Sequence, residues 1–158
     1  MKLAIASDHA GLKLKNRVID LLKKKDIEVK DFGTDNDESV DYPDFGMRVA
    51  EAVSRRQIER GILLCGSGIG MSIVANKYRG VRAALCYDTQ TARLSREHND
   101  ANILVMGGRL LAEPKALEIV RTWLETEFEG GRHARRIKKI LEIEKNNMNT
   151  HNERKGAN

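Results

Sequence analysis

Short apolar runs alternate along this chain with longer stretches in which apolar residues recur every three or four positions. The short runs are typical of buried strands, and they lie at residues 3–6, 27–32, 62–65, 81–86 and 103–106. The longer stretches predict helices at residues 11–25, 45–56, 71–77, 89–98, 114–128 and 133–145. Because a helix separates each pair of successive strands, parallel pairing is favoured. We therefore predict an α/β fold, a Rossmann-like three-layer α/β/α sandwich with a five-stranded parallel sheet.

The length of 158 residues fits a single domain, which we place at residues 1–145. Residues 146–158 are almost entirely polar and are expected to form a disordered tail. No apolar run approaches the roughly 18 residues that span a membrane, and the first apolar run breaks at Ser7, too early for a signal peptide. The sequence thus predicts a cytoplasmic protein with no membrane partner.

The net charge of +5 does not point to nucleic acid once it is located along the chain. Residues 1–130 hold equal numbers of basic and acidic side chains, so the whole excess lies in residues 131–158. Nucleic-acid binders usually combine a basic face with exposed aromatic residues, and aromatic residues make up only 4% of this chain. A local anion site or a solvated tail is the better interpretation.

A glycine-rich loop after the predicted strand 62–65 is the sharpest chemical feature. Gly66, Gly68 and Gly70 alternate at the start of a helix, so backbone N–H groups could converge on an anion or a developing oxyanion. The alternative is a plain tight turn. The spacing fits neither a dinucleotide-binding loop nor a P-loop. Cys65, directly before this loop, could be a base or nucleophile whose thiolate the helix start stabilises, or a buried core thiol.

Other polar residues follow predicted strands or end helices, and each allows two interpretations. Asp8 could act in a cleft at the sheet edge or cap the next helix. His98, at a helix C-terminus, could serve a site or only interact with the helix dipole. Arg132 and Arg136 lie on one helical face and could clamp a phosphate or form a solvated basic surface. Cys86 has no glycine loop beside it, and we expect it to be structural, without a disulfide or a cysteine zinc site.

Taken together, these residues resemble the ribose-5-phosphate isomerase B family, a group of sugar-phosphate isomerases that includes galactose-6-phosphate isomerase subunits. The matching motifs are SDHAG at 7–11, DYPD at 41–44, CGSGIGMSIVANK at 65–77, LSREHND at 94–100, GGR at 107–109 and EGGRHARR at 129–136. The resemblance implies an aldose–ketose isomerase that interconverts ribose 5-phosphate and ribulose 5-phosphate, a step of the non-oxidative pentose phosphate pathway. It also implies no metal or redox cofactor, and a homodimer or tetramer with sites shared between subunits.

The resemblance further assigns a role to each matched residue. Cys65 would move a proton between C2 and C1 through a cis-enediolate, and Ser67 would place a hydroxyl beside the substrate oxygens. His98 would help to open the furanose ring, and Asp8 would handle a sugar hydroxyl proton. Substrate-binding groups would come from the loop amides of Gly66, Gly68, Ile69 and Gly70, and from His9, Tyr42, Asn99, Arg109, Arg132 and Arg136. Among these, His9 and the three arginines would hold the phosphate.

Two departures from the family pattern, and two rival functions, bear on this interpretation. Many members carry Thr in place of Ser67, but the hydroxyl is kept. One branch lacks the cysteine and carries a glutamate where this chain has Met71, so this chain resembles the thiol branch. The rivals are an isomerase of a hexose phosphate such as allose or galactose 6-phosphate, and a non-catalytic anion-binding module of the same fold.

The predicted topology also separates two of the implied catalytic residues. Cys65 ends its strand, whereas His98 precedes the strand that begins near residue 103. In a parallel sheet these positions lie at opposite edges, about 17 Å apart for a five-residue strand. We therefore expect His98 to reach the Cys65 of a neighbouring subunit.

Overall fold

The computed structural model describes the backbone of residues 1–155 and the side chains of residues 1–147. Its centre is a parallel five-stranded sheet with the strand order β2-β1-β3-β5-β4. The strands are β1 (Lys2–Ser7), β2 (Glu28–Asp31), β3 (Arg60–Cys65), β4 (Ala83–Leu85) and β5 (Ile103–Gly107). The predicted five-stranded parallel sheet is confirmed.

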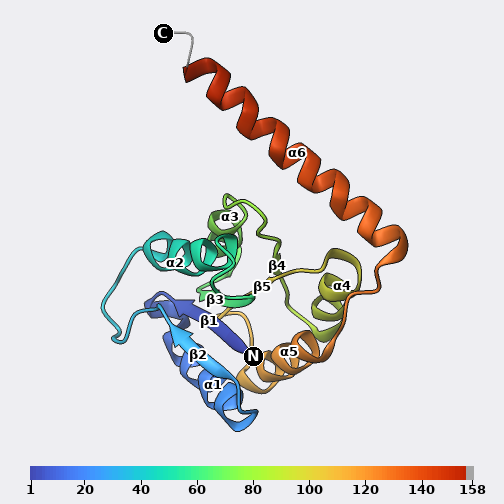
Figure 1. Cartoon of the computed structure of the whole chain (residues 1–158). Coiled ribbons are helices and arrows are strands. Elements are labelled where there is room, and N and C mark those ends of the chain that lie inside the picture. The colour runs from blue at the N-terminus through green and yellow to red at the C-terminus, as the bar shows by residue number, and fades with distance from the viewer. Residues whose placement is uncertain (156–158) are drawn as a thin grey trace.

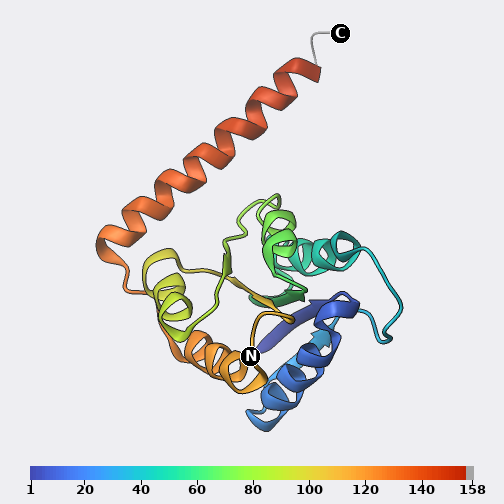
Figure 2. The ribbon, with the colours of Figure 1, turned by 180° about the vertical axis from the view of Figure 1, so that it is seen from behind.

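Helices cover both faces of this sheet, as Figures 1 and 2 show. They are α1 (Leu12–Lys24), α2 (Tyr42–Ser54), α3 (Ile69–Ala75), α4 (Thr89–Asn99), α5 (Glu113–Glu125) and α6 (Gly131–Lys155), with a short 3-10 helix η1 (His9–Gly11) after β1. In β3, Ile62 and Leu64 pack towards α1 and α5, whereas Leu63 and Cys65 pack towards α2 and α3. Burial on both faces explains why the central strands are continuously apolar.

The strand order brings three chemically loaded loops together, because β1, β3 and β5 are neighbours. Cys65 pairs in register with Gly107, and the Gly108 N–H donates to the Cys65 carbonyl at 2.8 Å. The loops approach closely: a Cβ on Gly107 would lie 2.7 Å from the Ser67 carbonyl oxygen, and one on Gly108 2.9 Å from that of Ala10. Glycine at these two positions is therefore what allows the loops to pack at the carboxyl edge.

The C-terminal segment differs most from the sequence prediction. The structure continues α6 to Lys155, ten residues beyond the predicted helix end at residue 145, and the expected disorder of residues 146–158 stays a prediction. The helix is anchored early, where Ile137 is buried and the Gly80 N–H donates to Glu144 Oε1 at 2.8 Å. Extending an existing helix is easy compared with nucleating one, and neither glycine nor proline interrupts residues 132–155. Residues 156–158 lie outside the described part of the chain.

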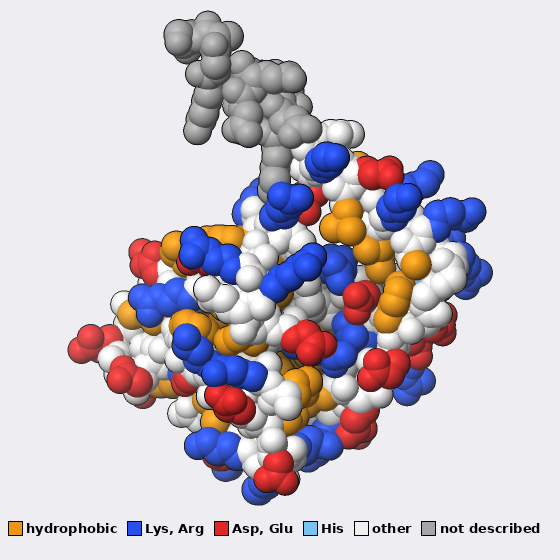
Figure 3. Space-filling view, viewed as in Figure 1, with side chains coloured by type: hydrophobic (Ala, Val, Ile, Leu, Met, Phe, Trp, Pro, Cys, Tyr) orange, Lys and Arg blue, Asp and Glu red, His pale blue; other side chains and the backbone are white. Residues whose placement is uncertain are grey.

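The outward part of α6 projects away from the body of the protein in both ribbon views (Figures 1 and 2). On the face seen in Figure 3, Lys and Arg side chains are interspersed with Asp and Glu side chains rather than gathered in one groove. Within the described residues, no helix has both the length and the apolar character needed to cross a membrane.

Candidate active site

A pocket opens at the carboxyl edge of the sheet, where the loops after β1, β3 and β5 meet. Its lining consists of Asp8, Tyr42, Cys65, Gly66, Ser67, Ile69, Gly70, Ile73, Arg109 and Leu110. The structure thus brings together the candidate base, most of the glycine-rich loop, a carboxylate and one arginine. This position agrees with the general rule that ligands of open parallel sheets bind beyond the carboxyl ends of the strands.

Cys65 is the last residue of β3 and is 4% exposed. Its Sγ accepts a hydrogen bond from the Gly68 N–H at 3.2 Å, and a donor aimed at sulfur favours negative charge there. Gly68 reaches this position with φ +83°, and a Cβ on it would lie 3.0 Å from the Met106 carbonyl carbon. Both the backbone conformation and the close packing therefore require glycine at position 68.

Cys86 has a different environment. It is 1% exposed, belongs to the core cluster between the sheet and α5, and its thiol donates to the Ala84 carbonyl oxygen at 3.7 Å. Burial raises the pKa of the Cys86 thiol to about 11. A thiol that stays protonated in the core supports the structural interpretation of this cysteine.

The glycine-rich loop uses some of its own amides internally. The Gly68 N–H is directed at Cys65, and the Ile69 N–H donates to Ser67 Oγ at 3.3 Å. A substrate oxygen that used either amide would have to compete with these contacts. Tyr42, at the start of α2, covers Gly70, because a Cβ on that glycine would collide with the tyrosine ring.

Asp8 and His9 follow β1 at the same edge. Asp8 Oδ1 accepts from the Gly11 N–H at 3.0 Å, so the capping interpretation is confirmed, although Asp8 also lines the pocket. His9 Nδ1 accepts from the Val40 N–H at 3.2 Å. In a neutral imidazole this places the proton on Nε2 and leaves that nitrogen as a donor.

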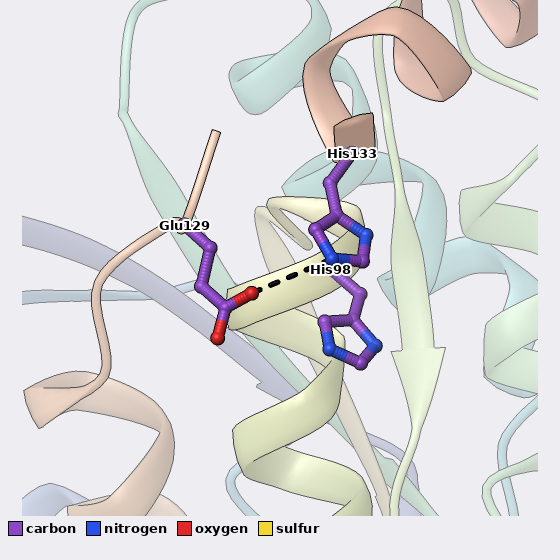
Figure 4. A group of neighbouring side chains, drawn as sticks. All are labelled: His98, Glu129 and His133. Atoms are coloured by element: carbon purple, nitrogen blue, oxygen red, sulfur yellow. Dashed lines mark ion pairs between the residues drawn. The ribbon is translucent and has the colours of Figure 1, made fainter. Parts of the chain in front are cut away.

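The remaining predicted residues lie elsewhere in the chain, around the end of α4 and the start of α6. The His98 ring stacks on the ring of His133 with centroids 4.1 Å apart (Figure 4). Asn99 ends α4, and its carbonyl oxygen accepts from Arg82 Nε at 3.0 Å. Arg132 Nε donates to His133 Nε2 at 3.3 Å, and Arg136 is exposed one turn further along α6. A single chain therefore does not bring these groups to Cys65.

His133 is a central member of this second cluster, and its side chain is 5% exposed. Burial is the main cause that lowers the pKa of His133, and the neighbouring His98 and Arg132 lower it further. The Glu129 carboxylate, 3.4 Å from Nε2, acts in the opposite direction. The net effect on His133 favours the neutral form of its imidazole.

Sequence analysis did not identify three residues beside the pocket. Ile73 and Leu110 line it with 55% and 61% of their surface exposed, and the Tyr87 hydroxyl donates to the Ser67 carbonyl at 3.0 Å. Ile73 lies four residues after Ile69, which is 52% exposed, so the two share a helical face. This four-residue spacing of isoleucines is the signal in the sequence that could have identified Ile73. Exposed apolar side chains around a polar pocket are typical of an interaction surface.

Comparison with known proteins gives consistent matches over most of the chain. The sequence matches the ribose/galactose isomerase family over residues 3–140. It is 52% identical to a putative sugar phosphate isomerase of Bacillus subtilis, over 94% of this chain and 100% of that protein. It is 43% identical to ribose-5-phosphate isomerase B of Escherichia coli, over 90% and 96%. The structure of Clostridium thermocellum ribose-5-phosphate isomerase B is similar with a TM-score of 0.91, 58% identity and coverages of 92% and 99%.

Proposed function

Because this chain belongs to the ribose/galactose isomerase family, we propose that it is an aldose–ketose isomerase that interconverts D-ribose 5-phosphate and D-ribulose 5-phosphate. The observation that carries this proposal is Cys65 at the mouth of the pocket, with the Gly68 N–H directed at its sulfur. Such an arrangement supplies a base beside a loop of backbone donors, which is what proton transfer next to a carbonyl requires.

In the proposed reaction, the Cys65 thiolate takes the proton from C2 of the open-chain aldose. The electron pair moves to the carbonyl, and the resulting cis-enediolate carries negative charge on oxygen. The thiol then returns its proton to C1 while the proton of the C2 hydroxyl is transferred to the C1 oxygen, which leaves the carbonyl at C2 and gives the ketose. Donors that meet the enediolate oxygens are worth about 2.7–4 kcal/mol each in comparable sites.

The other groups in the pocket have complementary roles. The Asp8 carboxylate moves a proton at a sugar hydroxyl, and Ser67 places its hydroxyl beside the reacting oxygens. The phosphate is bound by Arg109 and by the donor Nε2 of His9. Arg109 lies beside the glycine-rich loop, since its Cδ is 3.5 Å from the position that a Cβ on Gly66 would take. A phosphate held away from the reaction centre supplies binding energy that positions C1 and C2 against the base.

We further propose that each site is completed by a second copy of the chain. Register pairs Cys65 with Gly107 at the end of β5, whereas His98 and Asn99 precede the start of β5. The two groups are therefore separated by about 17 Å of strand and loop, too far for a side chain to cover. A homodimer in which a partner supplies His98, Asn99, Arg132 and Arg136 would also cover the exposed Ile69 and Ile73.

The activity is tested with purified full-length protein in the presence of EDTA. Ribose 5-phosphate should be converted to ribulose 5-phosphate faster than allose 6-phosphate or galactose 6-phosphate is isomerised. A preference for either hexose phosphate would replace the pentose assignment, and no isomerisation of any of the three would refute the proposal. Cys65→Ala should abolish turnover, and Cys86→Ala, the matched control, should leave it nearly unchanged.

The shared site is tested by complementation between two inactive variants. Cys65→Ala and His98→Ala proteins are mixed after dissociation and allowed to reassociate. In a mixed dimer, one site collects both lesions and the other is intact. Random pairing makes half of the dimers mixed, so about a quarter of the parent activity should return. If each site belonged to one chain, every site would keep a lesion and no activity would return.

A further inference from the structure

We propose that His98, Glu129 and His133 form a binding site for Zn²⁺, which the proposed isomerase reaction does not itself require. The three ligand atoms all lie within 4.8 Å of one another (Figure 4). Glu129 Oε2 and His133 Nε2 are 3.4 Å apart. Zinc bonds of about 2.0–2.2 Å in a tetrahedral site put neighbouring ligand atoms roughly 3.4 Å apart. One edge of the tetrahedron is therefore already formed.

The fold holds these residues together although they come from three segments. His98 lies on the last turn of α4, Glu129 on the linker after α5, and His133 on the first turn of α6. The Glu129 N–H donates to the Glu97 carbonyl at 3.1 Å, which fixes the linker against α4. The next two residues, Gly130 and Gly131, have φ +69° and +53°, so the chain turns sharply and directs α6 back over His98.

His133 offers a metal the lone pair of Nε2, the atom that accepts the hydrogen bond from Arg132. The groups facing the site act in both directions. Glu129 attracts a cation, whereas Arg132 and Arg136 repel it, and Arg132 Nε occupies His133 Nε2 at 3.3 Å. Binding therefore requires Arg132, which is exposed, to swing away and the His98 ring to rotate out of its stack on His133.

The ligand set selects among metals. Two imidazoles and one carboxylate suit Zn²⁺, whereas Mg²⁺ prefers an all-oxygen octahedral shell. Three protein ligands leave a fourth position for water, and the Glu129 side chain, 52% exposed, keeps that side open. A bound Zn²⁺ would hold the His98 imidazole away from the sugar. Inhibition of the isomerase is the expected consequence, and this part of the inference rests on the proposed function.

Direct binding is measured first, with Zn²⁺ competed against a chromophoric chelator. The background is Cys65→Ala, which removes the pocket cysteine as a rival zinc ligand. Adding Glu129→Gln should weaken Zn²⁺ binding at least tenfold, because loss of even an outer-shell partner costs about 10–100-fold. Glu127→Gln is the matched control, since it removes the same charge two residues earlier and from an exposed side chain. Equal affinities in the two double variants, or no zinc binding in Cys65→Ala, would overturn the site.

Inhibition is measured second, on proteins that retain Cys65. Glu129→Gln should keep the EDTA-treated turnover of the parent and require at least about tenfold more Zn²⁺ for half-inhibition, whereas Glu127→Gln should behave as the parent. Mg²⁺ should have no effect on either. Zinc inhibition that is identical in Glu129→Gln and the parent would refute the inhibitory role. A protein without isomerase activity in EDTA would refute the proposed function instead, and the binding measurement would still decide the site.

Discussion

Replacement of Lys15 by methionine tests how a buried charge supports the edge of the pocket. Lys15 lies on α1 with only 1% of its surface exposed. Its Nζ donates to the Thr34 carbonyl oxygen at 2.6 Å and forms an ion pair with Asp31 Oδ2 at 2.7 Å. Methionine preserves most of the stem and its packing but removes the charge and both contacts.

The expected loss follows from the two partners separately. Thr34 is 5% exposed, so its carbonyl oxygen would lose its partner in a buried place, which costs about 1–3 kcal/mol. The Asp31 side chain is 38% exposed and can be solvated, so its pairing adds at most about 1 kcal/mol. Relief of the desolvation of a buried ammonium acts in the opposite direction. We therefore expect the free energy of unfolding to fall by about 1–3 kcal/mol.

Urea unfolding at one fixed protein concentration measures this loss, because association also contributes to apparent stability. With an m-value of about 2 kcal/mol per molar urea, the midpoint should fall by roughly 0.5–1.5 M. Lys23→Met, an exposed change on the same helix, is the control and should stay within about 0.5 kcal/mol of the parent. If Lys15→Met proved as stable as Lys23→Met, the two Nζ contacts would contribute nothing and the reasoning would be refuted.

The same variant should affect substrate binding more than turnover. The loop after β2 is held by Lys15 at Thr34, and further along it the Val40 N–H donates to His9 Nδ1. Loosening this loop should misplace His9, which we assign to the phosphate, without touching Cys65. Steady-state kinetics should therefore show a raised KM for ribose 5-phosphate with a smaller change in kcat. A lowered kcat at constant KM would contradict this link.

Three further predictions concern the site residues. Arg136→Ala should raise KM for ribose 5-phosphate markedly. Arg136→Lys should restore only part of the lost substrate affinity, because an ammonium lacks the guanidinium fork. An unchanged KM in both variants would leave Arg136 as a solvated surface residue. Gly68→Ala should lower kcat and cost at least about 1–2 kcal/mol in urea unfolding, since position 68 has φ +83° and no room for a Cβ. Parent-like kinetics would show that the loop conformation at position 68 does not control the reactivity of Cys65. The pKa of His133 is lowered in the folded protein, so its stabilising contribution is present above the ordinary value of 6.5 and is lost as pH falls through the depressed pKa. His133→Gln should therefore flatten the loss of stability below pH 6.5. Parallel pH profiles of stability for the variant and the parent would contradict this.

Sequence patterns predicted the three central strands well because both faces of the sheet are buried there. The errors fall where a residue had two possible roles. Strand β3 begins at Arg60, two residues earlier than predicted, and this arginine is buried with its guanidinium 5.7 Å from the Trp123 ring centroid. A charged residue at a strand start gives no apolar signal. Helix α3 begins at Ile69, two residues before the predicted start, and includes Gly70, which the pattern assigned to the loop.

The site was predictable as far as it depends on strand ends, and not further. Cys65 and Asp8 were located because parallel strands end at one edge. Tyr87 and Leu110 reach the pocket only through the path of their loops, which hydrophobic periodicity does not encode. The contact between Tyr87 and the Ser67 carbonyl joins residues that are 20 positions apart, and a single sequence carries no signal for it.

The separation of Cys65 from His98 has a physical basis in how each group is held. Cys65 sits on a central strand whose loop is fixed by close glycine contacts. His98 is held as firmly elsewhere, because Asp100, in a left-handed conformation with φ 43°, is paired at 2.8 Å with both Arg82 and Arg96. Neither group can move to the other within one chain without breaking these contacts. With the roles proposed for Cys65 and His98, proton transfer and ring opening would act on one sugar only where the edges of two chains meet. The proposed activity and the proposed dimer therefore depend on the same surface.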